Sequence, residues 1–348
     1  MKIQVNARNR AYHFQAHDKE QMLFAGLRSG IDLPYECSTG TCGTCKARLI
    51  DGKIYDPWPE APGHKYCKNE LNEFLMCQCV ARADCTVEVG NFVYTMDPGA
   101  CLPRSFFGVI RATRMLTPDV MHLEIELDNP QNFDAGQFVV MEAPGVTGFR
   151  GYSMVNFERD AKKLEFVVKK KPGGGLSQWL FDSGSIAGRP VDLCGPLGHA
   201  TFFPNVKKNI LCIAGGSGIA GIISILARAS QEQYFNEYRG YVFFGVRTAK
   251  DSFFLDELEG FVRQFPERLQ VTVVFSEEDA PASLKQAHPD LLFGTGFVHD
   301  VAAQAMDGKY QNIRAYLAGP TPVVDTALRT LIVKGKLTTD NIRYDKFS

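Results

Sequence analysis

Residues 35–46 read Y-E-C-S-T-G-T-C-G-T-C-K and place Cys37, Cys42 and Cys45 in a C-x4-C-x2-C pattern. Every residue between these cysteines is Ser, Thr or Gly, so the loop can wrap closely around a metal centre and point its backbone N–H groups at the sulfur atoms. Two irons bridged by sulfides need four soft ligands, and this spacing supplies three of them in [2Fe–2S] proteins. The loop therefore predicts an iron–sulfur centre whose fourth ligand lies further along the chain.

The fourth ligand is expected in residues 75–79, which read L-M-C-Q-C. We favour Cys77, and Cys79 is a competing candidate. A zinc site is the alternative, but zinc sites usually combine C-x2-C pairs in tetrahedral sets of four and fit an x4 interval less well. The other cysteines show no such spacing and are interpreted as core residues or residues without a redox role: Cys67, Cys85, Cys101, Cys194 and Cys212.

Length and charge limit the class of protein. The chain has 348 residues, enough for two or three domains of roughly 100–200 residues each. Its 38 basic and 39 acidic residues leave a net charge of -1, which offers no general field for nucleic acid or an anionic membrane. Residues 1–10 lack the apolar run of a secretory signal, so the cysteines are expected to stay reduced. We expect a cytoplasmic protein that binds neither nucleic acid nor membranes, and we expect a monomer.

One uncharged stretch, residues 210–227, approaches the length of a membrane-spanning helix. Four glycines interrupt its middle: Gly215, Gly216, Gly218 and Gly221. A buried strand, a tight turn and a buried helix therefore explain the stretch better than a membrane span.

The patterns divide the chain into three domains. Residues 1–95 combine a predicted hairpin, a helix at 19–28 and the cysteine loop, and residues 96–103 form a predicted linker. Residues 104–204 contain short alternating segments, which predict an antiparallel β-barrel. Residues 205–348 alternate buried strands with helices, which predicts a doubly wound parallel sheet. The expected fold class is a multidomain combination of α+β and α/β units.

Residues 149–156, F-R-G-Y-S-M-V-N, resemble the R-x-Y-S pattern of the ferredoxin reductase flavoprotein superfamily, with Arg150, Tyr152 and Ser153 in the corresponding places. An Arg can bind a diphosphate through paired hydrogen bonds, a Tyr can stack on an isoalloxazine, and a Ser hydroxyl can hydrogen-bond near the flavin N5, where hydride arrives. The resemblance implies that these residues bind a flavin and that Ser153 stands beside hydride transfer as the catalytic residue.

Residues 167–180, V-V-K-K-K-P-G-G-G-L-S-Q-W-L, resemble the second flavin segment of the same superfamily. The resemblance implies that backbone and a helix start hold the ribose and diphosphate, using Val168, Lys169, Gly174, Gly175, Leu176 and Ser177. Gly175 departs from relatives, which often carry Arg or Lys there, so one diphosphate contact is lacking or is replaced by backbone N–H groups. FAD is favoured over FMN, because related FMN enzymes usually arrange their domains differently.

Two glycine-containing turns indicate a nicotinamide site. Residues 214–220, A-G-G-S-G-I-A, form a turn between a predicted strand and helix, where Gly215, Gly216, Ser217 and Gly218 could bind a diphosphate through backbone N–H groups. Residues 316–320, Y-L-A-G-P, resemble the superfamily's C-G-P-P segment under the nicotinamide. The resemblance assigns Gly319 and Pro320 to this site, and Ala318 replaces a common Cys, so no thiol is expected in hydride transfer.

Two further residues bear on the coenzymes. Arg247 follows a predicted strand that faces the adenosine ribose and could bind the 2′-phosphate of NADPH, but relatives with G-x-R here commonly use NADH, which we favour. Phe347, in the C-terminal I-R-Y-D-K-F-S, could cover the flavin ring before nicotinamide displaces it, or could simply anchor the last strand.

Nearly the whole chain resembles the reductase components of bacterial multicomponent oxygenases. The resemblance is strongest to the reductases of carbazole-type dioxygenases and toluene-type monooxygenases. Residues 34–79 resemble their plant-type ferredoxin domains, which implies a β-grasp fold for the first domain. The implied function is electron transfer from NADH through FAD and the cluster to an oxygenase component or its ferredoxin, by transient contact. The alternatives are a stand-alone NADH oxidoreductase for ferric or quinone acceptors and a [2Fe–2S] redox sensor.

Overall fold

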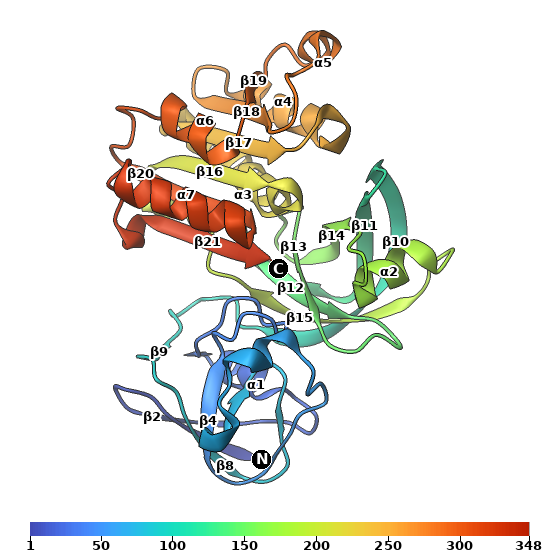
Figure 1. Cartoon of the computed structure of the whole chain (residues 1–348), viewed down its shortest axis with the longest axis vertical. Helices are drawn as coiled ribbons and strands as arrows, with labels where there is room; N and C mark the ends of the chain where they lie inside the picture. Colours follow the sequence, from blue (N-terminus) through green and yellow to red (C-terminus); the bar gives the residue numbers. More distant parts are fainter. Residues whose placement is uncertain (348) are drawn as a thin grey trace.

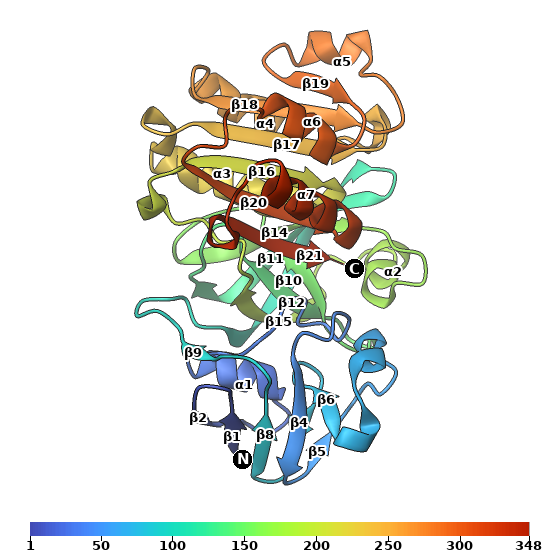
Figure 2. The same cartoon turned by 60° about the vertical axis from the view of Figure 1, so that its left-hand side comes forward.

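The computed structural model describes residues 1–347, which form three units arranged in a row. In Figure 1 the N-terminal unit lies at the bottom, a green barrel lies in the middle, and the C-terminal unit lies at the top. The rotated view in Figure 2 keeps this order.

The N-terminal unit is a mixed β-sheet with one α-helix. Its elements are β1 (Lys2–Asn6), β2 (Ala11–Gln15), α1 (Met22–Arg28), β3 (Ile31–Asp32), β4 (Lys46–Asp51), β5 (Ile54–Tyr55), β6 (Glu73–Leu75), β7 (Val80–Ala81), β8 (Cys85–Glu88) and β9 (Tyr94–Thr95). The main sheet has the order β2-β1-β8-β4-β6, in which β1 and β2 form the predicted hairpin and β1 runs parallel to β8. The cysteine loop connects β3 to β4 at one end of this sheet.

The middle unit is the predicted antiparallel barrel. Its elements are β10 (Arg104–Thr117), β11 (Val120–Gln131), β12 (Phe138–Glu142), β13 (Arg150–Ser153), β14 (Ala161–Lys169), α2 (Gly175–Asp182) and β15 (Pro190–Leu197). All paired strands are antiparallel, in the order β13-β12-β15-β10-β11-β14. A bridge between Met154 and Phe166 joins the two outer strands, so the sheet curls back on itself.

The C-terminal unit is the predicted parallel sheet. Its elements are β16 (Asn209–Gly215), α3 (Ile219–Gln231), β17 (Gly240–Val246), α4 (Leu255–Gln264), β18 (Leu269–Phe275), α5 (Ala282–Ala287), β19 (Leu292–Thr295), α6 (Val298–Ala305), β20 (Ile313–Pro320), α7 (Thr321–Val333) and β21 (Ile342–Phe347). The order β19-β18-β17-β16-β20-β21 is parallel throughout. Helices α3 and α4 pack into one apolar core and α6 and α7 into another, as a doubly wound sheet requires.

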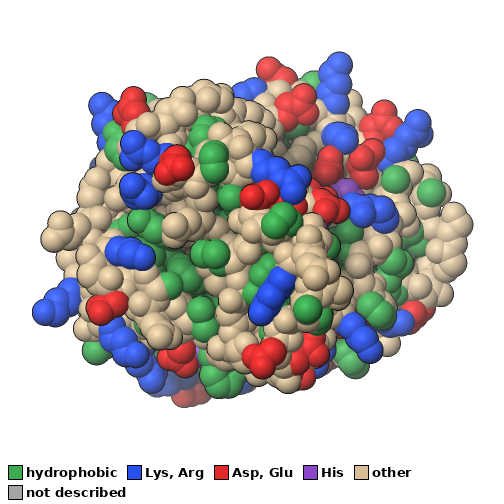
Figure 3. Space-filling model, turned by 90° about the horizontal axis from the view of Figure 1, so that it is seen from above, with side chains coloured by type: hydrophobic (Ala, Val, Ile, Leu, Met, Phe, Trp, Pro, Cys, Tyr) green, Lys and Arg blue, Asp and Glu red, His purple; other side chains and the backbone are tan. Residues whose placement is uncertain are grey.

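The uncharged stretch at 210–227 divides between β16 and α3, which confirms the strand, turn and helix predicted for it. Within residues 1–347, no helix combines the length and the apolar character needed to cross a membrane. On the face seen in Figure 3, basic and acidic side chains are interspersed rather than gathered by sign.

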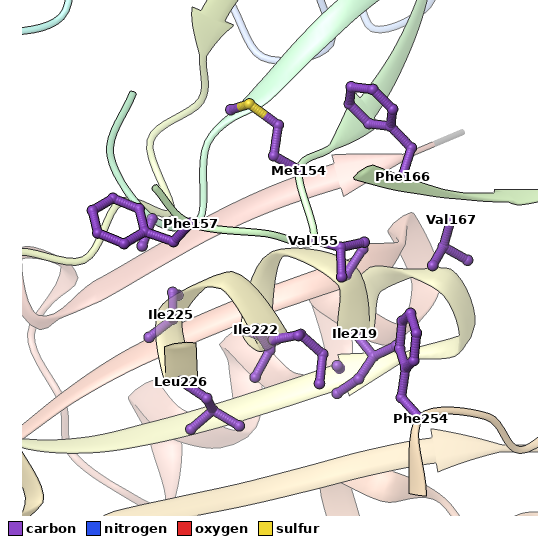
Figure 4. Close-up of a cluster of buried hydrophobic side chains, with 14 of the residues drawn as sticks. Met154, Val155, Phe157, Phe166, Val167, Ile219, Ile222, Ile225, Leu226 and Phe254 are labelled. Carbon is purple, nitrogen blue, oxygen red and sulfur yellow. The ribbon is translucent and has the colours of Figure 1, made fainter. Parts of the chain in front are cut away.

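Apolar contacts join the three units. One core extends from the barrel strands to α3, and Figure 4 shows Ile219 and Ile222 of that helix among Val155 and Phe157, which follow β13. The core of the N-terminal unit likewise continues into the barrel through Phe138 of β12. Because each interface buries apolar side chains from both sides, the units are held in one relative arrangement.

Candidate functional site

The cysteine loop and the segment after β6 bring the four predicted iron ligands together as two pairs. A hydrogen bond with the Cys42 thiol lowers the pKa of Cys37 to about 4. The second pair joins Cys45 and Cys77, where their mutual hydrogen bond and burial raise the pKa of Cys45. Within residues 1–347, no group of three or more His, Cys, Asp or Glu side chains is arranged to hold one metal ion. Two pairs of thiols suit a two-iron cluster better than a single tetrahedral zinc ion.

Backbone donors surround these sulfur atoms. The N–H groups of Thr39 and Cys42 both lie 3.4 Å from Cys37 Sγ, and the N–H of Thr44 lies 3.5 Å from Cys42 Sγ. The Ser38 hydroxyl is buried and has no hydrogen-bond partner among the described residues. Soft ligands, backbone donors aimed at sulfur and an unpartnered hydroxyl fit a [2Fe–2S] cluster held by this loop.

The competing candidate Cys79 lies in a different environment. Burial raises the pKa of its thiol, and the neighbouring Asp56 carboxylate adds to the effect. By contrast, Cys77 Sγ accepts a hydrogen bond from the Gln78 side-chain amide at 3.4 Å and pairs with Cys45. The structure therefore brings Cys77, rather than Cys79, against another predicted ligand.

A cavity of about 400 Å³, named here the flavin cavity, lies where the three units meet. Cys37 and Thr41 of the cysteine loop line one side of it, and Ser217 of the C-terminal unit lines another. The predicted flavin residues that line it are Arg150, Tyr152, Ser153, Lys169, Gly174, Leu176 and Ser177. Val168 and Gly175 are not among the lining residues, and the Val168 side chain is fully buried in the core.

Arg150 supplies positive charge to the flavin cavity. Within residues 1–347, no carboxylate lies within ion-pair distance of its guanidinium, which donates to the Phe149 carbonyl at 2.8 Å and lies 4.9 Å from the centre of the Trp58 ring. Burial lowers the pKa of Arg150, because the charged form loses hydration. The charge of Glu142 opposes this shift, but no close ion pair with a carboxylate is found for Arg150 among residues 1–347, and a half-buried cation of this kind fits an anionic ligand such as the FAD diphosphate.

Tyr152 and Ser153 follow Arg150 on β13. Tyr152 lines the cavity, and burial raises the pKa of its phenol above the ordinary value, at which the ring is already neutral near pH 7. Ser153 is only 7% exposed and is paired in register with Phe138 of β12, which fixes its position in the sheet. A fixed, neutral ring and a hydroxyl on one strand fit contacts with an isoalloxazine.

The second flavin segment forms a turn and the start of α2. Ser177 Oγ accepts the Lys171 N–H at 3.1 Å and lies 3.3 Å from the Lys171 carbonyl, so this hydroxyl closes the turn that precedes the helix. The first N–H groups of α2 lie beyond Gly174, where a helix leaves backbone donors free for an anion. This arrangement fits a phosphate group held mainly by backbone.

A second cavity, of about 350 Å³ and named here the nicotinamide cavity, lies at the carboxyl ends of β16 and β20. These strands are neighbours, and the strand order reverses between them, which is where doubly wound sheets bind ligands. The predicted residues that line this cavity are Gly215, Gly216, Ser217, Arg247 and Pro320.

Gly218 and Gly319 are predicted residues that do not line the nicotinamide cavity but allow its two turns to meet. A Cβ atom at Gly218 would lie 2.4 Å from the Ala318 carbonyl oxygen, and one at Gly319 would lie 2.9 Å from the Gly215 carbonyl oxygen. Only glycine permits such close backbone contact, so these residues shape the cavity from behind.

Arg247 has an acidic neighbour in the nicotinamide cavity. Its guanidinium lies 3.6 Å from Asp251, whose carboxylate also accepts the Thr248 N–H at 3.0 Å and the Thr248 hydroxyl at 2.8 Å. Burial alone would raise the pKa of Asp251, but the Thr248 hydrogen bonds and the Arg247 charge lower it. The predicted cation is therefore partly neutralised by a fixed carboxylate.

Phe347 lies at the end of the last strand and at the edge of the flavin cavity. It is the last residue of β21, where it pairs with Pro320, and it also lines the flavin cavity. Its ring packs edge-on against Phe138 with the ring centres 6.3 Å apart. The residue therefore anchors the final strand while its ring faces the cavity beside β12.

Several lining residues have no prediction from the sequence. In the flavin cavity they include Trp58, Pro62, Gly151, Val167, Lys171, Gly173 and Lys346, and in the nicotinamide cavity they include Gly245, Asp251, Phe253, Phe297 and Val298. A signal existed for Asp251, because Thr248 and Asp251 have the spacing of a capping box, and that box is present. Trp58 has no local signal for its role, since it reaches a cavity formed mainly by another unit.

Comparisons with known proteins identify the three domains. Models of the 2Fe-2S iron-sulfur cluster binding domain, the oxidoreductase FAD-binding domain and the oxidoreductase NAD-binding domain match residues 5–82, 108–202 and 212–329. The ferredoxin–NAD(P)+ reductase CarAd of Metapseudomonas resinovorans is 34% identical over 94% of each chain. The chain belongs to the ferredoxin–NAD(P)+ reductase family.

Two further relatives extend over the whole reductase. The ferredoxin–NAD(+) reductase component of the alkene monooxygenase system of Xanthobacter autotrophicus is 30% identical, covering 96% of this reductase and 97% of the relative. The solved structure of the ferredoxin reductase in carbazole 1,9a-dioxygenase matches with a TM-score of 0.81 and 31% identity, covering 100% and 99% of the two chains. This reductase is an oxidoreductase with [2Fe–2S], FAD and NAD domains, as the sequence predicts.

Proposed function

We propose that this reductase carries electrons from NADH, through FAD and a [2Fe–2S] cluster, to an oxygenase component or its ferredoxin. The observation that carries the proposal is the flavin cavity, which is lined at once by Cys37 of the cysteine loop, by the β13 residues and by Ser217 of the C-terminal unit. Relatives that serve alkene monooxygenase and carbazole dioxygenase systems support the oxygenase as acceptor.

FAD would connect the two-electron donor NADH to the one-electron cluster, because a flavin accepts two electrons as hydride and releases them singly. In the proposal Arg150 and the start of α2 bind the diphosphate, and Tyr152 holds the ring. Ser153 stands as a neutral hydrogen-bonding group beside the site of hydride arrival. The residues that bind the irons are Cys37, Cys42, Cys45 and Cys77, and the N–H groups around their sulfurs stabilise the negative charge of the cluster.

NADH is the proposed donor, because the acidic Asp251 stands beside Arg247 and disfavours the extra phosphate of NADPH. We also propose the domain limits 1–95, 104–204 and 205–348 with a linker at 96–103, which the ends of β9 and the start of β10 support. The partner is proposed to dock on the cysteine loop, where Cys42, Gly43 and Thr44 keep partial exposure, through a small and transient interface.

An anaerobic titration with NADH, and separately with NADPH, tests the proposal through visible spectra. We expect NADH to bleach the flavin and then the cluster, and NADPH to do so only at higher concentration. Bleaching of the flavin with an unchanged cluster would exclude the relay and favour a stand-alone oxidoreductase. Product formed with a matched oxygenase and NADH would identify the acceptor, and ferric or quinone reduction without it would favour the alternative.

A further inference from the structure

Trp58 lines the flavin cavity although it belongs to the N-terminal unit. It lies in a Pro-rich segment between β5 and β6, and its indole is only partly exposed. The position falls within residues 34–79, which resemble plant-type ferredoxin domains, but it is neither a predicted cluster ligand nor a predicted flavin residue, and its ring lines a cavity formed mainly by the barrel.

The chain around Trp58 is stiff and attached to the cysteine loop. Pro57 and Pro59 restrict the backbone on either side of it, and its N–H donates to Asp56 Oδ1 at 2.8 Å. A few residues further on, the Gly63 N–H donates to the Gly40 carbonyl of the cysteine loop at 2.7 Å. The position of the Trp58 ring is therefore tied to the position of that loop.

On its other side Trp58 contacts the barrel. The Arg150 guanidinium lies 4.9 Å from the ring centre, within the range of a cation–π contact. Gly148 lies directly against the same ring, since a Cβ atom there would be 2.6 Å from a Trp58 ring carbon, and its positive φ of 76° also favours glycine. The Trp58 ring therefore leaves no room for a side chain at position 148.

We propose that Trp58 is a positioning residue for FAD, which acts by holding the Arg150 guanidinium over its ring so that the N–H groups at its edge face the diphosphate. The Arg150 guanidinium is held from two sides, by its hydrogen bond to the Phe149 carbonyl at 2.8 Å and by the Trp58 ring at 4.9 Å, and the indole is the side-chain contact that fixes its direction. FAD retention and the packing of the N-terminal unit on the barrel then share one contact, in addition to the apolar core that joins the two units. The inference rests on the proposed function, because it takes the flavin cavity to be the FAD site.

The test compares three variants of the full-length holoenzyme. Trp58→Ala removes the ring, Trp58→Phe keeps a smaller ring, and Phe92→Ala is the matched control, since Phe92 is an aromatic of the same unit that is 59% exposed and does not line the flavin cavity. The rate of FAD release is followed by the rise in flavin fluorescence after dilution. Iron content is measured in parallel, and stopped-flow spectra separate flavin reduction by NADH from the reduction of the cluster.

We expect Trp58→Ala to release FAD about two- to thirtyfold faster, the range that a cation–π contact supports. Trp58→Phe should lie between Trp58→Ala and the wild-type protein, and Phe92→Ala should match the wild-type protein. We also expect cluster reduction to slow more than flavin reduction in Trp58→Ala, a difference that general loss of stability would not produce. If Trp58→Ala loses its iron, the release rate of Trp58→Phe carries the test.

FAD release at the wild-type rate from both Trp58 variants would overturn the inference, as would an equal acceleration in Phe92→Ala. The release assay needs no NADH, so it remains decisive even if the wild-type cluster is not reduced. In that case the proposed relay fails while the role of Trp58 is judged separately.

Discussion

The flavin cavity and the nicotinamide cavity differ in how they are built and how their charge is balanced. The flavin cavity takes residues from all three units, and its Arg150 contacts the Trp58 ring and the Phe149 carbonyl and feels the charge of Glu142 without a close ion pair. The nicotinamide cavity is lined mostly by the C-terminal unit, with Val120 and Lys169 from the barrel, and its Arg247 lies 3.6 Å from Asp251. A cofactor that stays bound can complete a charged site, whereas a coenzyme that comes and goes suits a site whose charges are balanced without it.

The largest expected effect is the loss of the iron–sulfur cluster from a protein whose flavin and nicotinamide cavities still work. Cys77→Ser should abolish the visible cluster signal and one-electron transfer to cytochrome c, because a hydroxyl is a poor substitute for a soft thiolate. NADH should still bleach the flavin, since the nicotinamide and flavin cavities do not include Cys77. Visible and electron paramagnetic resonance spectra check both outcomes.

Cys79→Ser is the matched control for this prediction, because it makes the same change two positions away, where the side chain lies near Asp56. We expect it to retain the cluster. A chain that keeps its cluster without Cys77 and loses it without Cys79 would contradict the ligand assignment.

The second prediction tests the difference between the two arginines. Arg150→Ala should weaken FAD binding on the order of 10- to 100-fold, the cost of removing a charged hydrogen-bonding group from a partly buried site. Arg150→Lys should lose part of this affinity, because a single ammonium cannot reproduce the planar fork. Fluorescence titration of FAD measures both.

Arg247→Ala should change the KM for NADH by less than about threefold, since its side chain is 60% exposed and already has an acidic neighbour. An equal loss of affinity for FAD in Arg150→Ala and for NADH in Arg247→Ala would mean that charge balance does not distinguish the two cavities.

The sequence predicted the parts of both cavities that depend on local patterns. The cysteine spacing, the β13 residues and the glycine turn each form from adjacent residues, so a short motif contains the information. The strand and helix patterns were similarly local, and the uncharged segment at 210–227 was interpreted correctly as β16 and α3. Backbone turns of this kind depend on residue type more than on distant packing.

Contacts between units could not be predicted in this way. Trp58 and Arg150 are far apart in the sequence, and their contact depends on how the N-terminal unit packs on the barrel. The role of Ser177 in closing its own turn also differs from a simple ligand contact, because its hydroxyl bonds to Lys171. Asp251 had a capping signal, but its place beside Arg247 follows from the geometry at the end of β17.

The third prediction concerns coenzyme preference. Asp251→Asn should narrow the preference for NADH over NADPH about three- to tenfold, because it removes a negative charge near the position proposed for the 2′-phosphate. The ratio of kcat/KM for the two coenzymes measures this. Asp300→Asn is the control, since Asp300 is an exposed acid of α6 that does not line the cavity. An unchanged ratio in Asp251→Asn would remove Asp251 from the account of specificity.

The smallest expected effect concerns the strand that brings the C-terminal unit to the flavin cavity. Asp345 of β21 accepts the His199 N–H at 3.2 Å, but its second oxygen is buried with no partner among the described residues. Burial raises the pKa of Asp345 to about 6 from an ordinary 3.8, although the charge of His199 opposes the shift. Because the folded chain holds this proton more tightly than the unfolded chain, the contribution of Asp345 to stability is fully present below pH 3.8 and is lost as the pH rises through about 6.

Asp345→Asn should therefore raise the free energy of unfolding by about 1 kcal/mol at pH 8, less than the full cost of the shift because the amide is still buried. Thermal unfolding at pH 8 and at pH 5 checks this, and the gain should be smaller at the lower pH, where the wild-type carboxyl is largely protonated. Asp340→Asn, at an exposed acid just before β21, should show no such pH dependence. A variant at Asp345 that is less stable at both values would mean that the carboxylate, despite its burial, stabilises the strand that carries Phe347 to the flavin cavity.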